Sequence, residues 1–359
     1  DGKPNLIATI PGASEWTLLY EGHVDTVPYE REAWNHDPLG ERVDDRIYGR
    51  GSTDMKGAVA VMIETLRQFV TTDERPPITL QFAFVSDEET GGEAGINAVL
   101  GAEAISADAA VVGETTATAD RYSVAVADKG RIWLTIEAMG QAAHGSRPMC
   151  GTNAIDRLYD EITDCRELIT TSRLSYPEPV KRIVDETVDY YNVSSDDTPL
   201  ASQEVFAYPT VNLGQLDGGS MINSVPGTAT AKVDVRVTPG ASTAAVFERI
   251  DGCIKPKSDI SITSVSTEEG TYIDPNDPFV ETVTAAGRSV GDQRVFRQCA
   301  TGGGDVKKLR AADIPAVEAA VGSDTAHGVD EYISADALVA TAEWYRRLPA
   351  LLADTPTLQ

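Results

Sequence analysis

The sequence predicts an α/β protein with a mostly parallel sheet, into which a smaller α+β domain is inserted. Strand-like and helix-like segments alternate in the first third of the chain, the rhythm changes in the middle, and the first pattern returns near residue 270. A chain of 359 residues with 42% hydrophobic residues can bury two moderate cores. We therefore expect a discontinuous metal-binding catalytic domain of residues 1–120 and 270–359, and an inserted domain of residues 121–269.

Apolar runs in the discontinuous domain follow one another as parallel strands and crossover helices do. The expected elements, in chain order, are strand 17–24, helix 57–70, strand 78–85, helix 93–101, strand 108–114, a helix within 272–291, strand 314–322 and helix 334–348. Polar residues stand where the first three strands end. Because open α/β sheets bind ligands at the carboxyl ends of their strands, we expect a functional site there.

The middle of the chain predicts a βαββαβ unit, a ferredoxin-like arrangement. Its expected elements are strand 131–140, helix 153–169, strands 209–216 and 228–239, helix 242–254 and strand 260–266. The stretch 175–204 that interrupts this unit reads as a loop. The order of elements therefore predicts a compact inserted lid or dimerisation domain.

The charge of the chain limits its partners and its location. A net charge of −26, from 56 acidic and 30 basic residues, repels nucleic acids and anionic membranes, so we expect neither as a partner. No run of 18 apolar residues and no signal-peptide pattern occurs, and the four cysteines are widely spaced without a CxxC pair. We expect a soluble cytoplasmic protein whose cysteines are reduced thiols and form neither a disulfide framework nor a thiolate metal site.

The acidic residues are spread along the whole chain, which suggests a halophilic source. At 1 M salt the Debye length falls to about 3 Å, so a salt-rich cytoplasm screens the repulsion between these charges. Melting curves at low and multimolar KCl test this hypothesis, and equal stability in both would contradict it. The alternative is an ordinary acidic protein of a mesophile.

Two of the four histidines stand in sequences that favour metal binding. His23 lies at the end of an expected strand in "GHVDTVP", where Asp25 can orient its imidazole, and His327 lies in "TAHGVDE" soon after another expected strand. A single histidine is more often structural, and we assign that role to His36 in "WNHDPLG".

Acidic residues complete a candidate metal site. Asp54 follows a glycine-rich turn in "GRGSTDMKG", Glu88 and Glu89 follow one strand, and Glu114 ends another. Carboxylates with imidazoles suit Zn²⁺, Co²⁺ or Mn²⁺. Two ions about 3.5–4 Å apart need a bridging carboxylate, and one carboxylate must stay free as a general base. Asp87, before the two glutamates, is expected to be a turn residue.

Five motifs now stand in order along the chain. They are "GHVDTVP" (22–28), "GRGSTDMKG" (49–57), "SDEETGG" (86–92), "VVGE" (111–114) and "AHGVDE" (326–331). In this order they closely resemble the motifs of the dinuclear zinc amidohydrolase and peptidase family that contains acetylornithine deacetylase, succinyl-diaminopimelate desuccinylase, aminoacylases and glutamate carboxypeptidases. The resemblance covers nearly the whole chain, and the ordered set is specific although each motif alone is weak.

The resemblance implies two divalent metal ions, Zn²⁺ in the first place with Co²⁺ or Mn²⁺ as alternatives. It implies that Asp54 bridges both ions. The terminal ligands it implies are His23 and Glu114 for one ion, and Glu89 and His327 for the other.

It implies further roles around the ions. Asp25 orients His23, and Glu88 takes a proton from the attacking water and passes it to the leaving amine. A cis peptide bond between Asp54 and Met55 is also implied. Family members usually have several dozen residues before the segment that matches "PNLIATIPG", so we expect this chain to begin inside the catalytic domain. "GETT" at 113–116 replaces the more usual Glu-Pro and leaves Glu114 intact.

The inserted domain resembles the lid and dimerisation domain of the family. His144 in "GQAAHGSRP" matches a histidine that reaches across a homodimer to stabilise the oxyanion, although it could merely cap a turn. Asn223 and Arg236 match residues that hold the carboxylate of the substrate; a surface ion pair is the alternative for Arg236. Gly302 and Gly303 in "TGGGD" match a substrate-facing loop, and a plain turn is the alternative there.

The expected function is metal-dependent hydrolysis of an amide bond in an N-acyl amino acid or small peptide that bears a free carboxylate, as in acetylornithine deacetylase or succinyl-diaminopimelate desuccinylase. A dipeptidase or carboxypeptidase of the same family is one alternative. A non-catalytic homologue that only binds metal or dimerises is another. The sequence contains neither a G-x-S-x-G elbow nor an H-E-x-x-H helix, which disfavours serine hydrolases and zincins.

Overall fold

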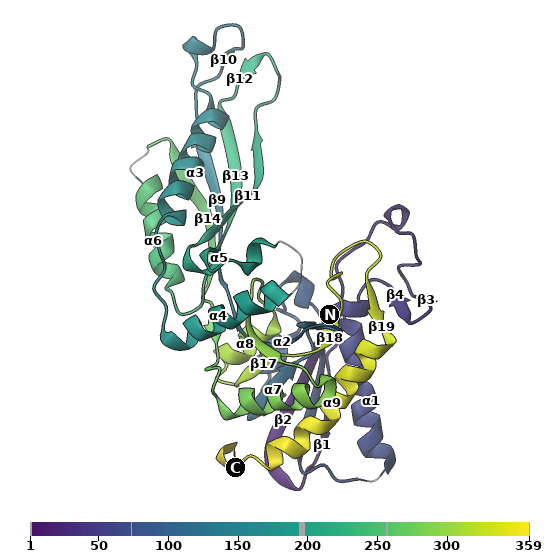
Figure 1. Ribbon diagram of the computed structural model, residues 1–359. Coiled ribbons are helices and arrows are strands. Elements are labelled where there is room, and N and C mark those ends of the chain that lie inside the picture. The colour runs from purple at the N-terminus through teal and green to yellow at the C-terminus, as the bar shows by residue number, and fades with distance from the viewer. Residues whose placement is uncertain (1, 73, 194–197, 256–257, 359) are drawn as a thin grey trace. The chain divides into compact units, whose positions relative to one another are not determined.

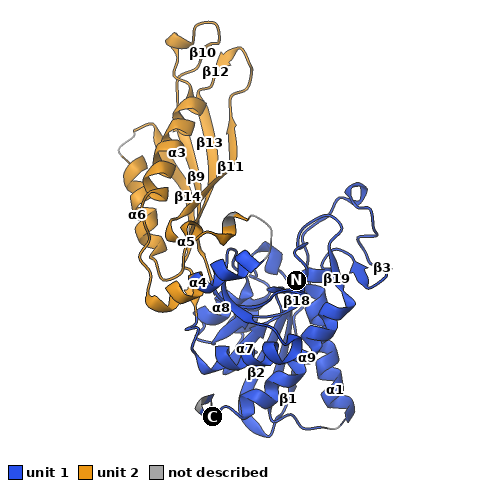
Figure 2. Ribbon diagram, in the orientation of Figure 1, with its two compact units in different colours: residues 1–127, 185–196, 273–359 blue, residues 128–184, 197–272 orange. Residues whose placement is uncertain are grey.

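The structure, a computed structural model, describes residues 2–72, 74–193, 198–255 and 258–358. It divides into two compact units (Figure 2). Unit 1 comprises Asp1–Ala127, Asp185–Asp196 and Ile273–Gln359, and unit 2 comprises Asp128–Val184 and Asp197–Tyr272. The segment Asp185–Asp196, which the sequence analysis placed in the inserted domain, belongs to unit 1. Among the described residues, no helix has both the length and the apolar character needed to cross a membrane.

Unit 1 is built on a mostly parallel central sheet, as predicted (Figure 1). The strands β2, β5, β6 and β17 pair in parallel, whereas β1 and β8 add antiparallel strands. Across the sheet the order is β1 (Leu6–Ile10), β5 (Ile78–Val85), β2 (Ser14–His23), β6 (Ala109–Val112), β17 (Ala316–Glu318) and β8 (Tyr122–Asp128), with β16 (Val295–Ala300) also pairing with β8.

Helices cover both faces of this sheet, which explains why its inner strands are apolar at nearly every position. On one face lie α1 (Gly57–Thr72), α7 (Pro278–Gly291) and α9 (Ala335–Ala353), and on the other lie α2 (Ile96–Gly101) and α8 (Asp305–Ala311). Successive residues of β2 alternate between the faces: Leu19 joins the core under α2 and α8, whereas Tyr20 packs on Tyr345 of α9 with ring centroids 4.8 Å apart.

Short elements surround the sheet of unit 1. A three-stranded sheet contains β19 (Tyr332–Ser334), β4 (Arg46–Tyr48) and β3 (Glu41–Val43), and a small parallel pair contains β18 (Val321–Gly322) and β7 (Ala117–Thr118). The predicted single strand 314–322 is therefore wrong. The chain bends at Ala319 and Ala320 and exchanges β6 for β7 as its partner, so β17 and β18 are separate strands. One-turn helices occur at Arg31–Ala33, Ser52–Lys56, Glu88–Thr90, Pro148–Cys150, Pro199–Ala201 and Pro356–Leu358.

Unit 2 has the predicted βαββαβ order. Its antiparallel sheet runs β11 (Thr210–Gly218), β13 (Thr228–Val237), β9 (Gly130–Met139) and β14 (Ile260–Glu268), with α3 (Ala154–Thr170) and α6 (Thr243–Ile254) packed against it. Ile132, Leu134 and Ile136 of β9 point into the core beneath these helices, whereas Trp133 is half exposed. The short strands β10 (Ala143–His144) and β12 (Ser224–Val225) pair with each other, and β15 (Thr271–Tyr272) follows β14 along the chain.

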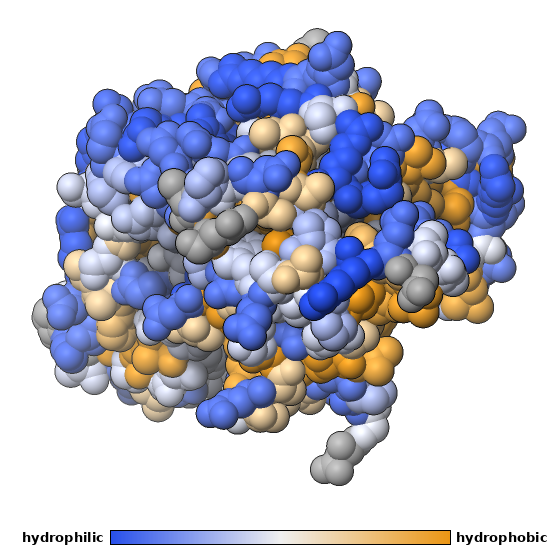
Figure 3. Space-filling view, turned by 90° about the horizontal axis from the view of Figure 1, so that it is seen from below, coloured by the Kyte–Doolittle hydropathy of each residue, from blue (hydrophilic) through white to orange (hydrophobic). Residues whose placement is uncertain are grey.

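The loop predicted for residues 175–204 is largely helical. It contains α4 (Glu178–Val193) and the start of α5 (Glu204–Ala207). The signal was present in the sequence, because Val180, Ile183, Val184, Thr187 and Tyr190 recur at helical spacing and all are buried. Figure 3 shows a face of the molecule on which hydrophilic residues alternate with apolar patches, in keeping with the acidic composition.

Candidate active site

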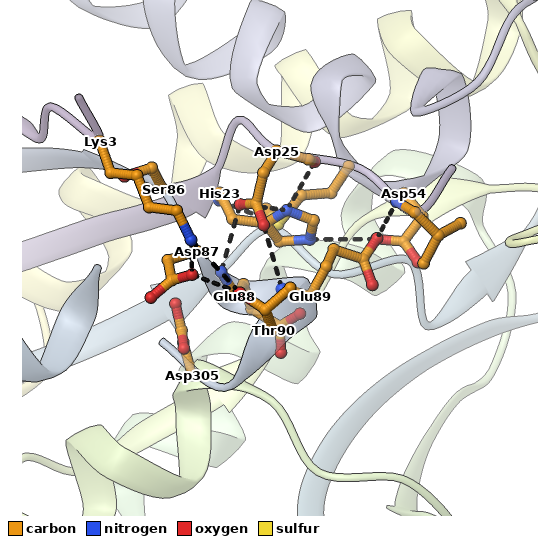
Figure 4. A network of polar contacts seen from close by, with 12 residues as sticks. Lys3, His23, Asp25, Asp54, Ser86, Asp87, Glu88, Glu89, Thr90 and Asp305 are labelled. Carbon is orange, nitrogen blue, oxygen red and sulfur yellow. Dashed lines mark hydrogen bonds and ion pairs between the residues drawn. The ribbon is translucent and has the colours of Figure 1, made fainter. Parts of the chain in front are cut away.

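Three neighbouring parallel strands bring the predicted site residues to one edge of the sheet. His23 is the last residue of β2 and lies opposite Val85, the last residue of β5, while Glu21 lies opposite Val112, the last residue of β6. Glu88 and Glu89 therefore leave β5, and Glu114 leaves β6, beside the end of β2. Figure 4 shows His23, Glu88 and Glu89 in this cluster, together with Asp25 and Asp54.

The first candidate metal cluster contains His23, Asp54 and Glu114. The Nε2 atom of His23 lies 3.1 Å from Asp54 Oδ1 and 3.3 Å from Glu114 Oε1. The His23 side chain is 1% exposed and the two carboxylates are partly buried. Three ligand atoms within 4.8 Å of one another can hold one ion.

The second candidate metal cluster contains Asp54, Glu89 and His327. The Nε2 atom of His327 lies 3.0 Å from Asp54 Oδ2 and 3.2 Å from Glu89 Oε2, and these ligand atoms also lie within 4.8 Å of one another. Asp54 thus directs one carboxylate oxygen to each cluster, as a bridging ligand must. Oxygen and imidazole ligands in two such sets fit a pair of borderline or hard divalent ions.

Glu331 holds the turn that carries Asp54. Its carboxylate is fully buried and accepts hydrogen bonds from the backbone N–H groups of Thr53 (3.0 Å), Asp54 (3.1 Å) and Gly51 (3.0 Å), as well as from Arg50 Nη1 (2.5 Å). The implied cis peptide bond between Asp54 and Met55 is present. The sequence analysis missed Glu331, although it closes the "AHGVDE" motif directly before the chain enters β19.

Asp25 connects the end of β2 to the turn after β5. Its Oδ1 lies 3.6 Å from His23 Nδ1, and its backbone oxygen lies 3.1 Å from the same nitrogen. The carboxylate also accepts from the backbone N–H groups of Glu88 (3.2 Å) and Glu89 (3.1 Å). With Nδ1 occupied in this way, His23 presents Nε2 to the first cluster.

Glu88 belongs to neither cluster and is the carboxylate left free. Burial, with a further contribution from the negative charge of Glu114, raises the pKa of Glu88 to about 8. Gly304 lies against it: a Cβ atom on Gly304 would stand 3.3 Å from Glu88 Oε1. The glycine loop therefore meets Glu88 through Gly304, whereas Gly302 has open space around its Cα and Gly303 faces the side chain of Lys307.

Two further groups fix the turn that carries Glu88 and Glu89. Lys308 of α8 donates from Nζ to the backbone oxygen of Gly91 (2.8 Å) and to Asp305 Oδ1 (3.0 Å). Asp87 is more than the turn residue the sequence suggested: it adopts a left-handed conformation with φ 76°, and its carboxylate accepts from Ala94 N (2.9 Å) and pairs with Lys3. The contact with Lys3 lowers the pKa of Asp87. Neither role has a local sequence signature.

The carboxylates of the site outnumber the histidines that could balance their negative charge. Burial, with a further contribution from neighbouring acids, raises the pKa values of Glu89 and the fully buried Glu21, and burial raises that of Glu114 although its contact with His23 opposes the shift. Burial opposes the charged form of His23, but its contacts with Asp25, Asp54 and Glu114 outweigh burial and raise the pKa of His23. Protons thus occupy the metal-free site, and bound cations would displace them.

We expect the metal-free protein to lose thermal stability as the pH rises from about 5 to about 8. The pKa of Glu88 is about 8 in the folded chain, against about 4.3 for an unperturbed glutamate. In this window the folded chain retains a proton that the unfolded chain has released, so the free energy of unfolding falls with rising pH. Melting temperatures with chelator and with added metal measure the effect.

Bound metal should make this fall shallower, and so should Glu88→Gln in the metal-free protein. A melting temperature of the metal-free protein that stays constant or rises between these pH values would contradict the assignment of a buried, protonated Glu88.

The remaining predicted residues lie outside this cluster. In unit 2, His144 is exposed, and its Nδ1 accepts from the backbone N–H of Ser146 (3.1 Å), which leaves the proton of the neutral ring on Nε2. Arg236 makes a two-pronged ion pair with Asp234 (2.9 and 3.1 Å), and Asn223 accepts through its backbone oxygen from Gly145 (2.6 Å). In unit 1, His36 stacks on Tyr48 with ring centroids 3.7 Å apart, which is a structural role.

Comparisons with known proteins agree with this geometry. A family model described as peptidase family M20/M25/M40 matches residues 19–350. Acetylornithine deacetylase of Photorhabdus laumondii is 34% identical over 242 residues, which are 67% of this chain and 54% of that protein. The chain thus spans about half the length of the curated relatives it matches.

Solved structures show the same fold. The M20 family metallo-carboxypeptidase Sso-CP2 from Sulfolobus solfataricus has a TM-score of 0.80 at 18% identity, covering 98% of this chain and 88% of that chain. A dinuclear metal-binding peptidase of the M20 family from Bacillus subtilis has a TM-score of 0.59 at 15% identity, covering 98% of this chain and 85% of that chain.

Proposed function

Because this chain belongs to peptidase family M20/M25/M40, we propose that it hydrolyses an amide bond in an N-acyl amino acid or short peptide that carries a free carboxylate. The observation that carries the proposal is the position of Asp54. One of its oxygens faces His23 and the other faces His327, while Glu88 stands free beside them. This arrangement suits two divalent ions, and Zn²⁺ is our first choice, with Co²⁺ and Mn²⁺ as alternatives.

The chemistry divides between the ions and the residues of the chain. When bound, two divalent ions polarise the amide carbonyl and lower the pKa of a water molecule. Glu88 takes a proton from the attacking water at its carboxylate and delivers it to the leaving nitrogen. Burial raises the pKa of Glu88 into the neutral range. A group with such a pKa can both accept a proton and return it. Asp25 contacts both the backbone N–H of Glu88 and the ring of His23, and so fixes the position of one relative to the other.

The curated relatives suggest which group the protein removes from its substrate. Acetylornithine deacetylase of Photorhabdus laumondii, at 34% identity, favours a deacylase that acts on an amino-acid derivative. A dipeptidase or carboxypeptidase is the alternative, and the likeness to the solved carboxypeptidase from Sulfolobus solfataricus supports it. A homologue that binds metal without turnover is the alternative of another class.

A substrate screen tests the proposal. The metal-stripped protein is reloaded with Zn²⁺, Co²⁺ or Mn²⁺ and assayed on N-acetylornithine, N-succinyl-diaminopimelate, other N-acyl amino acids and dipeptides. Metal-restored release of a free amine is the expected result. Preference for a dipeptide would select the peptidase alternative, whereas two bound ions without hydrolysis of any substrate would overturn the enzymatic function.

We further propose a homodimer in which His144 serves the partner's site. The exposed ring can donate from Nε2, as stabilisation of an oxyanion requires. In unit 2, Arg236 and Asn223 are proposed to bind the substrate carboxylate. To bind the substrate carboxylate, Arg236 would have to break its ion pair with Asp234.

Complementation tests the role across the dimer. His144→Ala and Glu88→Gln should each be nearly inactive as homodimers, whereas mixed dimers should regain activity because one of their two sites is intact. Mixing each variant with wild-type protein provides the control for subunit exchange. No recovery in dimers that have exchanged subunits would contradict the proposal.

We also propose a reducing, salt-rich cytoplasm as the location of the protein. No disulfide joins the four cysteines, all of which lie among the described residues, and salt would screen the repulsion within a chain of net charge −26.

A further inference from the structure

A second group of metal-binding side chains lies in unit 2, and the proposed reaction does not use it. Glu161 and Cys165 stand one helical turn apart on α3, and Cys253 lies on α6, the helix packed beside α3. Glu161 is 5% exposed, Cys165 is 6% exposed and Cys253 is half-buried. One carboxylate oxygen and the two sulfurs lie within 4.8 Å of one another.

The distances within this group fit a tetrahedral zinc site. Glu161 Oε1 lies 3.8 Å from Cys165 Sγ and 3.5 Å from Cys253 Sγ. In a tetrahedral site with Zn–S bonds of about 2.3 Å and Zn–O bonds of about 2.0 Å, a sulfur and an oxygen ligand stand about 3.5 Å apart. An ion could therefore be bound with small movements of the side chains.

We propose that Glu161, Cys165 and Cys253 bind a Zn²⁺ ion that joins α3 to α6. Both helices lie on the core of unit 2, so the ligands come from rigid elements. Thiolates select Zn²⁺ over the hard cations that carboxylates prefer. Because Cys253 is only half-buried, a water molecule can reach the ion and fill its fourth position. On binding, two S–H bonds break, two protons pass to solvent and two Zn–S bonds form, so no oxidant is required.

Two other states of the same group are outcomes of the test. The two thiols can simply donate hydrogen bonds to Glu161, with no affinity for metal. Alternatively, Cys165 and Cys253 can form a disulfide. The first predicts that the reduced chain binds no metal through its thiols. The second predicts that Cys165 and Cys253 are joined in protein kept without reductant.

Cobalt substitution distinguishes this group from the proposed dinuclear site. The ligands of the dinuclear site are oxygen and nitrogen atoms, so they give no thiolate-to-cobalt charge transfer. The reduced, metal-stripped full chain is titrated with Co²⁺. Wild-type protein should develop a near-ultraviolet thiolate-to-cobalt absorption, and Cys165→Ser and Cys253→Ser should both lose it. Each variant should also bind one equivalent of Zn²⁺ fewer per chain.

Cys150→Ser is the matched control, because Cys150 is exposed and lies outside the group. It should keep the absorption. Glu161→Gln keeps both sulfurs and the side-chain volume, so it remains informative if a cysteine variant fails to fold; it should weaken Co²⁺ binding at least about tenfold, the lower end of the cost of disturbing a metal's surroundings.

The proposal is overturned by absence of the absorption in wild-type protein, which would leave only hydrogen-bonded thiols. An absorption that persists in both Cys165→Ser and Cys253→Ser would also overturn it. So would peptide mapping without reductant that finds Cys165 joined to Cys253 in protein purified with metal present.

Discussion

Glu88→Gln should lower kcat by roughly a hundred- to ten-thousandfold, the range of a lost general base, while both metal equivalents stay bound. The amide has the shape of the carboxylate but cannot accept a proton from water at neutral pH. Glu88 stands outside both metal clusters, and its backbone is held by Asp25 independently of its side chain. Kinetics on the best substrate of the screen and metal analysis of the same sample measure the two halves of the prediction.

Glu93→Gln is the matched control, because Glu93 lies on the same loop but is exposed. It should leave kcat and metal content unchanged. If Glu88→Gln retained wild-type kcat, another group would be the base; if it lost one metal equivalent, Glu88 would be a ligand and the assignment of the two adjacent glutamates would be wrong.

Asp54→Asn should weaken the binding of both metal ions and abolish turnover. Each carboxylate oxygen of Asp54 faces a different cluster, so a carboxamide can serve only one of them and presents an N–H₂ group to the other. Disturbing a group that only orients a ligand already costs about 10–100-fold in metal affinity. We therefore expect a loss of at least about a hundredfold here, measured by metal titration.

Two comparisons make this prediction specific. Glu114→Gln should chiefly affect the cluster that contains His23, so one of the two ions of the dinuclear site should remain tightly bound. Asp45→Asn, on an exposed position before the same motif, should change neither affinity. Retention of two tightly bound ions by Asp54→Asn would show that Asp54 does not bridge.

Much of unit 1 could be predicted because its signals are local. The strand β5 and the second half of β2 are buried at nearly every position, and helices must cover the sheet on both faces. Parallel strands end at one edge, so His23, Glu89 and Glu114 could be placed together from strand ends alone. That Asp54 and His327 join them was implied by the ordered motifs and not by any spacing.

The residues that hold the ligands could not be predicted, because they act across long sequence distances. Glu331 accepts from the backbone of residues 51, 53 and 54, and Lys308 donates to the backbone of Gly91. A backbone N–H or carbonyl leaves no trace in the sequence. The error at α4 had another cause: the helical spacing of its buried residues was overlooked, and Pro179 stands in the first turn, where a helix tolerates proline.

The spread of the ligands along the chain has a consequence for biosynthesis. His23, Asp54 and Glu114 are all made before unit 2, whereas His327 is made after it. During translation, the first cluster can therefore capture an ion while the second still lacks its histidine. The dinuclear site proposed for this chain therefore lacks its last ligand until the ribosome has passed residue 327, after the whole of unit 2 has been made.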